Sequence, residues 1–400
     1  QRAGCELRLQ RVGARRDRDD CPLSDVPVHR DLLEVARADD VDVVVECIGG
    51  LTLARELVET AIDHGKSVVT ANKALIAEHG NELLERAEQA GVALLFEAAV
   101  AGGIPILKAL REGMAANQLH SVAGIINGTG NYILTEMGAG GRAFEDVLAE
   151  AQALGYAEAD PSFDVDGIDA AHKLTILASM AFGIPLDFSA VYCEGIGEVT
   201  PVDIQLAAEL GYRIKHLGIA KQLDEGVELR VHPTLLPAES LLANVDGVLN
   251  AVYLDAHAAG PTLYSGAGAG RLPTASAIVA DIVDIARGGP VPRSPLGVPV
   301  ARLRPQPAVP AAAVRCAWYL RLTVEDRPGV MSLLSNCLSA EGISIEALIQ
   351  KPPRRGESTV PIVVLTDPAR EDALRRAVEA ITGLDAVVDR PHCIRCESIS

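Results

Sequence analysis

The amino-acid sequence predicts an α/β protein of three domains, and three patterns along the chain support this prediction. Strand-like and helical segments alternate over residues 1–103, as they do where helices cross between parallel strands. Residues 104–290 mix long helical stretches with strand-like runs, which is typical of an α+β domain with an open sheet. Residues 291–314 are rich in Pro and Ala and predict a linker, and residues 315–400 show the order βαββαβ of a ferredoxin-like domain.

The first domain is predicted to be a partial Rossmann-type dinucleotide-binding domain. Its clearest strand is the β-branched run VDVVVECIGG, which ends in two glycines and is typical of a buried parallel strand. A complete domain of this type opens with a strand and a G-x-G-x-x-G loop, and this chain has neither at its start. We expect a fragment or a variant without the loop, and we favour the fragment. The predicted strands are residues 6–14, 41–50, 67–70 and 92–100, and the predicted helices are residues 51–64 and 74–91.

The elements of the other two domains follow from the same kinds of apolar pattern. In the middle domain the predicted helices are residues 144–154, 167–182 and 201–217, and the predicted strands are residues 121–128, 226–237 and 247–256. In the C-terminal domain the predicted strands are residues 318–324, 344–350, 358–366 and 384–388, and the predicted helices are residues 330–341 and 369–381.

The composition excludes several classes of protein. Hydrophobic residues make up 48% of the chain, so global disorder is not expected. There are 36 Lys and Arg against 54 Asp and Glu, a net charge of -18, and no basic run exceeds two residues, so we expect no nucleic-acid partner. No uncharged apolar run reaches the length of a membrane helix and the first residues lack the apolar core of a signal peptide, which predicts a soluble cytoplasmic protein.

The eight cysteines are scattered and predict no disulfide framework. Cys393 and Cys396 form one CxxC pair, with only His392 beside them. A zinc site needs two further ligands, so we expect reduced surface thiols rather than a metal or redox site.

Three features of the first domain indicate where a dinucleotide binds. Gly49 ends a parallel strand, where a glycine lets the main chain approach a flat ring or a phosphate, although a tight turn also uses glycine. Lys73 follows the next strand on the ligand side of the sheet, although a lone lysine is often simply solvated. Arg15 and Arg16 follow the first recognisable strand, where arginine suits the 2′-phosphate of NADP, although they equally fit an ordinary surface.

Three further segments predict ligand contacts. Glu97 lies in an apolar segment followed by two glycines and a proline, so its carboxylate and nearby carbonyls could hold a hard cation, or Glu97 could accept N–H bonds at a helix entry. Asn127, Gly128 and Thr129 end a strand before a helix and could hold a small polar substrate. The run GAGAG, which ends at Gly270, opens a long apolar helix whose N–H groups could hold an anion or a dinucleotide.

The densest segment is GYAEADPSFDVDGIDAAHK, in which five carboxylates precede Lys173. Asp169 and Lys173 are four residues apart on one helix, so they share a face that is half-buried by the apolar residues after them. A lysine held among carboxylates keeps its charge and can donate a proton to an alkoxide that forms at a carbonyl. The alternative is a salt bridge at an acidic helix start, and we expect His172 to be structural. The carboxylates are those of Glu158, Asp160, Asp164, Asp166 and Asp169.

Taken in order, these motifs make residues 1–290 similar to homoserine dehydrogenases. The motifs are VVVECIGG, TANKALI, FEAAVAGGIPIL, GIINGTGNYIL, GYAEADPSFDVDGIDAAHK and GAGAGRLPTASA, and DPSFDVDGIDAAHK is the most specific of them. The last domain, with DRPGVMSLLSNCLSAEGISIEAL, resembles an ACT domain, as found in longer bacterial members of that family.

The resemblance implies interconversion of L-homoserine and L-aspartate 4-semialdehyde with NADP(H) or NAD(H), in threonine, methionine and isoleucine synthesis. It implies a proton donor and acceptor at Lys173, beside Asp169, and a dimer or tetramer formed through the middle domain. The substrate positions that it implies are Asp169, Glu158 and Asp164, the cofactor positions are Lys73 and Gly270, and the sodium site is Glu97 with the carbonyls of Val100, Gly102 and Ile104.

Two other functions stay open at this point. The absent glycine loop also fits a chain that binds an amino acid through its ACT domain and no longer catalyses. Another NADP-dependent dehydrogenase of a small amino acid is the third possibility. L-Threonine is the expected effector, at the turn of residues 326–330, whose alternative role is that of a tight loop.

Overall fold

The computed structural model describes residues 4–16, 25–287, 294–351 and 358–399. The chain forms two compact units, and each unit is assembled from three stretches of sequence. The first unit comprises Gln1–Val122, Asp169–Val191 and Leu249–Gln306, and the second comprises Ala123–Ile168, Tyr192–Val248 and Pro307–Ser400.

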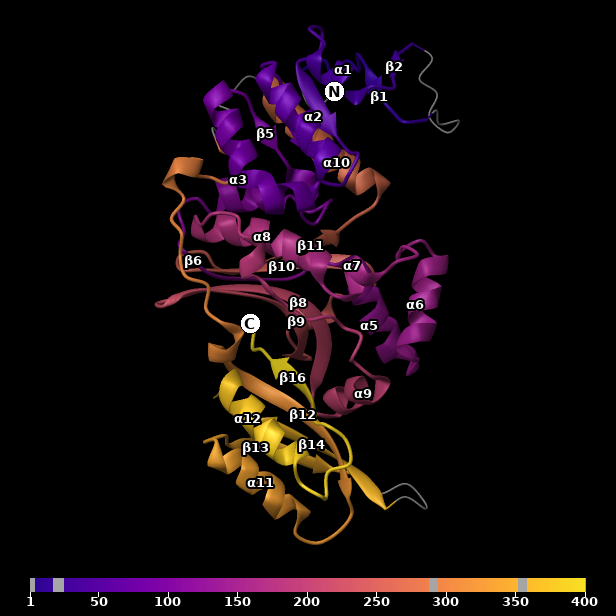
Figure 1. The fold of residues 1–400 in the computed structure, drawn as a ribbon, viewed down its shortest axis with the longest axis vertical. Coiled ribbons are helices and arrows are strands. Elements are labelled where there is room, and N and C mark those ends of the chain that lie inside the picture. Colours follow the sequence, from indigo (N-terminus) through magenta and orange to yellow (C-terminus); the bar gives the residue numbers. More distant parts are fainter. Residues whose placement is uncertain (1–3, 17–24, 288–293, 352–357, 400) are drawn as a thin grey trace. The chain divides into compact units, whose positions relative to one another are not determined.

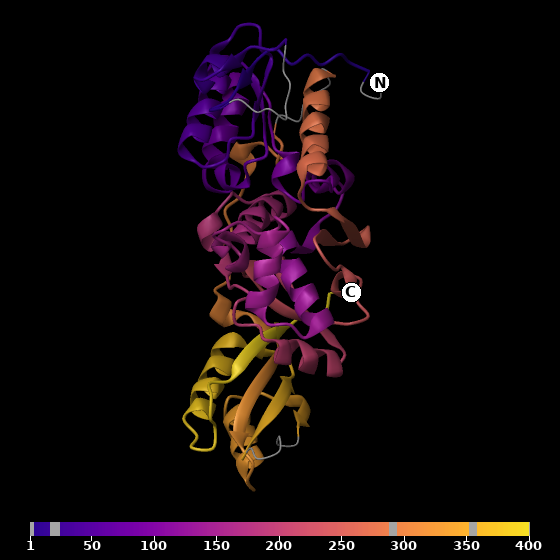
Figure 2. The same ribbon diagram turned by 90° about the vertical axis from the view of Figure 1, so that its right-hand side faces the viewer.

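The first unit is built around a parallel sheet with the strand order β3-β4-β5. One face packs on α10, because Ile278, Ile282 and Ile285 contact Val69 and Leu95. Figures 1 and 2 show this orange helix beside the indigo and purple elements, although it lies far from them in sequence. The elements are β3 (Val43–Glu46), α2 (Thr52–Asp63), β4 (Ser67–Thr70), α3 (Lys73–Ala90), β5 (Leu94–Leu95) and α10 (Arg271–Ala286).

Three predicted strands of the first domain are shorter than expected, and the one predicted at residues 41–50 is only Val43–Glu46. Only Val12–Gly13 (β1) of residues 6–14 is a strand, paired in parallel with Val28–His29 (β2) before α1 (Leu32–Arg37). Leu7 and Leu9 stay exposed, so no buried face supports a longer strand. The strand predicted at residues 92–100 is reduced to Leu94–Leu95, because the chain then turns into the 3₁₀ helix Glu97–Ala99.

The rest of the first unit contains a hairpin that is only partly predicted. β10 pairs antiparallel with β11 over their whole length, and β11 was not expected because its residues are rich in Gly and are half exposed. The GAGAG run begins with the last two residues of β11 and continues to the start of α10. The remaining elements here are α4 (Ile106–Lys108), a π-helical turn (Ala109–Gly113), β6 (Leu119–Ile125, which passes into the second unit), α8 (Ile168–Phe182), the 3₁₀ helix Phe188–Ala190, β10 (Leu249–Ala256), β11 (Gly260–Ala267) and the 3₁₀ helix Val300–Arg302.

The second unit is dominated by the long antiparallel hairpin of β8 and β9. The helix predicted at residues 201–217 is wrong beyond Glu209, where α9 ends. Gly211 then adopts a positive φ of 83°, and the buried apolar run after it forms β8. Such a run does not show by its periodicity whether it is helix or strand. The elements are α5 (Gly128–Gly140), α6 (Phe144–Ala153), α7 (Ser162–Val165), β7 (Tyr192–Cys193), α9 (Pro201–Glu209), β8 (Tyr212–Leu223), β9 (Gly226–Pro237) and the 3₁₀ helix Leu242–Asn244.

The ferredoxin-like order of residues 315–400 is present, but its last strand is displaced. Residues 384–388 form only an isolated bridge from Val387 to Val324, and the fourth strand is β16. The strand order β16-β12-β14-β13 is that of a ferredoxin-like sheet. The elements are the 3₁₀ helix Ala311–Ala313, β12 (Arg315–Glu325), α11 (Val330–Ala340), β13 (Ile345–Gln350), β14 (Thr359–Thr366), β15 (Ala369–Arg370), α12 (Glu371–Thr382) and β16 (His392–Cys396).

The strand β16 also joins the ferredoxin-like sheet to the β8–β9 hairpin. It pairs antiparallel with β12 and in parallel with β9, where Arg395 lies opposite Thr234. Cys396 is buried in this junction, so the expectation of surface thiols at the CxxC pair is wrong for it. The start of the predicted linker, up to residue 293, lies outside the described residues, and its later part is fixed by the bond from Val309 N–H to the carbonyl of Val227 at 2.8 Å.

Among the described residues, no helix combines the length and the apolar character needed to cross a membrane.

A buried carboxylate ties α9 to the ferredoxin-like strand β12. Asp203 is 0% exposed and accepts hydrogen bonds from Arg321 Nε at 2.6 Å and from Tyr319 Oη at 3.2 Å. Burial alone would raise the pKa of Asp203, but hydrogen bonds from His392 and Arg321 hold it well below its ordinary value of 3.8.

We expect the substitution Asp203→Asn to lower the free energy of unfolding by roughly 3 kcal/mol at pH 7, because it leaves Arg321 without a charged partner. Folding lowers the pKa of this carboxyl, so its contribution is complete above 3.8 and is lost as the pH falls below that value. Urea unfolding followed by the fluorescence of Trp318, the single tryptophan, should therefore show the difference at pH 7 and a smaller one at about pH 3.5. Equal stability of the two proteins at pH 7 would contradict this account.

Candidate active site

In the first unit, two predicted site residues, Lys73 and Lys173, contact the carboxylate of a third, Asp169. Asp169 Oδ1 lies 2.9 Å from Lys73 Nζ, and Asp169 Oδ2 lies 2.6 Å from Lys173 Nζ. The side chains of Asp169 and Lys173 are 5% and 10% exposed, so the pair is more deeply buried than the sequence predicted, whereas that of Lys73 is 33% exposed. Burial opposes ionisation of Asp169, but the two ammonium groups outweigh it and hold its pKa well below the usual range.

The local structure explains why these groups meet. Asp169 and Lys173 lie one turn apart at the start of α8. Lys73 is the first residue of α3, which Asn72 caps by accepting from Leu75 N–H at 3.1 Å. His172 is buried and stacks on Phe188 with the ring centroids 4.2 Å apart, as a structural residue would.

The loop after β3 fits a dinucleotide. Glu46, which is completely buried, accepts from Ile48 N–H at 2.7 Å, from Gly49 N–H at 3.1 Å and from the hydroxyl of Thr70 at 2.5 Å. Gly49 has a φ of 70°, and a Cβ there would meet no atom within 4 Å, so the main chain faces open space. The sequence reasoning missed Glu46, whose one signal is that it is the only charged residue of an apolar strand.

Arg15 and Arg16 lie shortly after β1, which forms a separate two-stranded sheet with β2 and is not part of the β3-β4-β5 sheet. Both arginines are exposed, so they are accessible to a phosphate. The neighbouring Arg30 donates to the carbonyl of Ala14 at 2.9 Å, which fixes the main chain just before the two arginines.

The carboxylate of Glu97 caps a helical turn. It accepts from the N–H groups of Leu107 and Lys108, both at 3.0 Å, as the helix-entry alternative predicted. The N–H of Glu97 donates to Asp281 of α10 at 2.8 Å. Burial and the nearby Asp281 raise the pKa of Glu97 to about 7, and burial raises that of Asp281 to about 6. Asp281 was missed, although it is an acid within an apolar helix.

The loop after Glu97 packs against the GAGAG run. Ala101 and Gly102 have φ values of 53° and 36°, and Gly103 N–H donates to the carbonyl of Ala267 at 2.9 Å. A Cβ at Gly102 would lie 2.7 Å from the carbonyl oxygen of Gly268, so only glycine fits there. Gly270 caps α10 with a φ of 115°. The candidate sodium residues Val100, Gly102 and Ile104 offer only main-chain oxygens, which suit a hard cation.

In the described part of the chain, no group of three or more His, Cys, Asp and Glu side chains is placed to hold a metal ion. This result does not concern sites made of carbonyl oxygens.

The predicted substrate residues of the second unit are partly assembled. Asn127 accepts from Gly130 N–H at 2.7 Å through Oδ1 and donates to Asp164 Oδ1 at 2.7 Å through Nδ2. The hydroxyl of Thr129 donates to the carbonyl of Tyr156 at 2.7 Å, which fixes the turn before Glu158. The side chain of Glu158 is exposed, and Gly128 begins α5.

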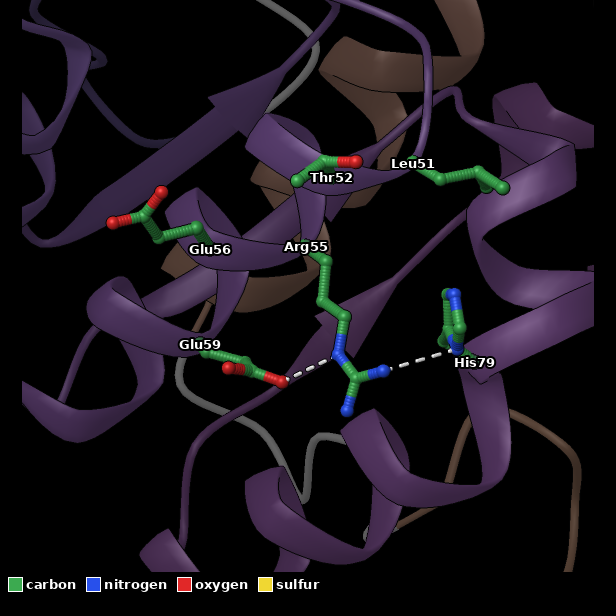
Figure 3. A pocket seen from close by; sticks show the side chains of 6 residues that line it. All are labelled: Leu51, Thr52, Arg55, Glu56, Glu59 and His79. Carbon is green, nitrogen blue, oxygen red and sulfur yellow. Dashed lines mark hydrogen bonds and ion pairs between the residues drawn. The ribbon is translucent and has the colours of Figure 1, made fainter.

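An open pocket of about 350 Å³ lies elsewhere on the first unit, between α2 and α3. Figure 3 shows Arg55 at its centre, bound to Glu59 and to His79. None of the predicted site residues lines it, so it does not define the active site.

A parallel sheet with glycines at its carboxyl edge and a carboxylate held between two lysines fits an oxidoreductase of the nicotinamide-dependent class. Three family models match the chain: "Homoserine dehydrogenase, NAD binding domain" over residues 1–97, "Homoserine dehydrogenase" over residues 105–283 and "ACT domain" over residues 318–383.

Full-length relatives give the same assignment. The homoserine dehydrogenase of Pseudomonas aeruginosa is 52% identical, over 100% of this chain and 93% of its own. The crystal structure of a homoserine dehydrogenase from Thiobacillus denitrificans is 51% identical with a TM-score of 0.94, over 99% of this chain and 92% of its own. A hyperthermophilic archaeal homoserine dehydrogenase in complex with NADPH is 29% identical with a TM-score of 0.59, over 67% of this chain and 79% of its own.

The chain belongs to the homoserine dehydrogenase family. It is an oxidoreductase that acts on a CH–OH group with a nicotinamide cofactor. The predicted fold class, with a Rossmann-like NAD-binding domain, a sheet-rich substrate domain and a C-terminal ACT domain, is confirmed.

The raised pKa of Glu97 predicts a pH dependence of stability. Folding raises this pKa from 4.5 to about 7, so the wild type should lose stability relative to Glu97→Gln as the pH rises from 4.5 to about 7, and the difference should then stay constant. A tenfold change in the acid dissociation constant on folding corresponds to about 1.4 kcal/mol of stability. Chemical unfolding of both proteins at several pH values without added sodium measures the effect, and a difference that does not change with pH would contradict the prediction.

Proposed function

We propose that the chain interconverts L-homoserine and L-aspartate 4-semialdehyde with NADP(H) or NAD(H), and that Lys173 moves the proton. The observation that carries this proposal is the contact of Asp169 with both Lys73 and Lys173. When bound, the nicotinamide supplies or accepts the hydride.

Lys173 acts as the general acid when the aldehyde is reduced. Its ammonium group donates a proton to the oxygen that gains negative charge, and its amine takes the proton back in the reverse direction. Lys173 Nζ donates a hydrogen bond to Asp169 Oδ2 at 2.6 Å. This bond fixes the direction of the long lysine side chain and so removes much of its orientational freedom. Lys73 on the other oxygen keeps Asp169 ionised and adds positive charge near the oxygen of the substrate.

Polar groups near α5 and α7 bind the amino-acid part of the substrate. Asp164, oriented by Asn127, and Glu158 supply carboxylates for its ammonium group. Thr129 and Gly128 at the start of α5 fix the main chain around them.

The cofactor residues are Gly49, Lys73, Arg16 and Gly270. Gly49 and Gly270 let main-chain atoms approach the dinucleotide, and Arg16 binds the 2′-phosphate of NADP. The archaeal relative in complex with NADPH supports NADP as the cofactor. Glu97 and the carbonyls of Val100, Gly102 and Ile104 would hold a sodium ion that neutralises charge and stiffens this loop.

The ACT domain binds an amino-acid effector, and we propose L-threonine at residues 326–330. A role in threonine, methionine and isoleucine synthesis in the cytoplasm, and a homodimer or homotetramer formed through the middle domain, complete the proposal.

Lys173→Met should lower kcat with aspartate semialdehyde and NADPH by about 10²–10⁴-fold, because it removes the ammonium group that donates the proton. The affinity for NADPH, measured by its fluorescence, should change little. The matched control is Lys66→Met, since this second buried lysine donates to the carbonyl of Val41 at 2.8 Å and its removal should leave kcat unchanged. Wild-type turnover in Lys173→Met would overturn the role, and no turnover in the wild type would overturn the proposed function.

Arg16→Ala should raise the KM for NADPH by about tenfold, the effect of one lost charge-assisted contact, and leave the KM for NADH unchanged. Steady-state kinetics with both cofactors, with Arg15→Ala beside it, decide which arginine meets the phosphate. Equal changes for NADPH and NADH in Arg16→Ala would contradict a 2′-phosphate contact.

A further inference from the structure

A buried arginine of β16 connects the ACT domain to the middle domain within the second unit. The side chain of Arg395 is 4% exposed, and its guanidinium donates to Glu371, the first residue of α12, at 3.0 Å. It also donates to Glu194 Oε2 at 2.7 Å and to Tyr192 Oη at 3.2 Å. Its planar group lies 5.0 Å from the ring centroids of Tyr192 and Trp318, so it is fixed in direction.

Arg395 contacts Tyr192 and Glu194, and residues 192–196 are hydrogen-bonded to residues 165–166. These two residues belong to the segment GYAEADPSFDVDGIDAAHK, called the acidic segment below. Ile196 N–H donates to the carbonyl of Val165 at 2.9 Å, and Cys193 Sγ donates to the carbonyl of Asp166 at 3.1 Å. A Cβ on Gly195 would lie 2.6 Å from the carbonyl oxygen of Val165, and a Cβ on Gly167 would lie 2.9 Å from Cys193 Sγ. At such close approach a shift of one segment displaces the other.

The acidic segment carries a residue that the proposed function assigns to the substrate. Asp164 lies on α7 (Ser162–Val165), directly before the carbonyl that Ile196 contacts, and Asn127 bonds to its carboxylate. Hydrogen bonds therefore connect α12 to Arg395, Arg395 to Glu194, and Ile196 to α7, and the main chain joins Glu194 to Ile196.

We infer that Arg395 is a positioning residue for the substrate, which sets the place of Asp164 through residues 192–196 and makes it depend on the ACT helix α12. This inference rests on the proposed function. Arginine suits the task because its rigid fork binds two carboxylates from different elements at once. A separate ion pair anchors the end of β16 to β9: Arg230 of β9 lies 2.7 Å from Glu397, the residue directly after β16. Arg395 is therefore not needed to hold these two strands together.

Three variants of the full chain test the inference through kinetics. Arg395→Met and Glu194→Gln should raise the KM for aspartate semialdehyde by about tenfold, less than the ~100-fold effect of a 1 Å misplacement. The KM for NADPH should stay within about twofold, and kcat should change less than the substrate KM. Arg395→Lys should recover part of the loss. Arg375→Ala is the matched control, since Arg375 also pairs with Glu371 but is exposed and does not belong to the chain of contacts that leads to α7.

Hydrogen exchange separates a failure of this inference from a failure of the proposed function. In Arg395→Met and Glu194→Gln, amide exchange should quicken in residues 162–167 and 192–197 and stay as in the wild type elsewhere, whether or not the chain turns over. Arg375→Ala should exchange as the wild type does. Unchanged exchange and unchanged substrate KM in both variants would overturn the inference, as would a uniform rise in exchange across the second unit. No turnover in the wild type, with the localised change present, would overturn the proposed function alone.

Discussion

The carboxylate of Asp169 is the interaction on which the proposed chemistry depends. A carboxylate whose side chain is 5% exposed is costly to bury as an ion unless charges compensate it, and here two lysines do so at 2.9 and 2.6 Å. The three groups carry a net positive charge, which suits an oxygen that becomes negative during hydride transfer. Since Lys73 is the first residue of α3 and Asp169 is the second residue of α8, the same contact also fixes the starts of two helices of the first unit relative to each other.

In the second unit, buried charged residues connect the ACT domain to the middle domain, which separate family models match. The ACT family match ends at residue 383, but β16 completes the ferredoxin-like sheet and pairs with β9 of the middle domain as well. Asp203 and Arg395 are both buried at this junction and have partners on each side. Ion pairs of this kind add little stability over apolar packing, but each demands one geometry. The ACT domain is thus held in a defined register on the hairpin of β8 and β9.

The sequence predicted the contact of Asp169 with Lys173 better than it predicted the strands, for a physical reason. Asp169 and Lys173 are four residues apart on a helix, so local geometry brings them together, and the motifs around them are specific. Glu46 and Asp281 are each an acid in an apolar element, but their contacts with Thr70 and with the N–H of Glu97 join residues that are distant in sequence, so the pattern does not reveal these contacts. β16 was missed because Arg395 interrupts its apolar pattern, and its charge is acceptable only beside Glu194 and Glu371. The sequence predicts a helix over the first half of β8, up to residue 217, because a run that is buried on both faces has no clear periodicity.

The most direct test of this account is the turnover of Asp169→Asn, with aspartate semialdehyde and NADPH both saturating and with NADPH binding measured by fluorescence. The amide keeps the shape of the side chain but removes the charge that holds the two ammonium groups. We expect kcat to fall by about 10²-fold or more while the dissociation constant of NADPH changes by less than about twofold. A kcat close to that of the wild type would show that the carboxylate does not organise the site.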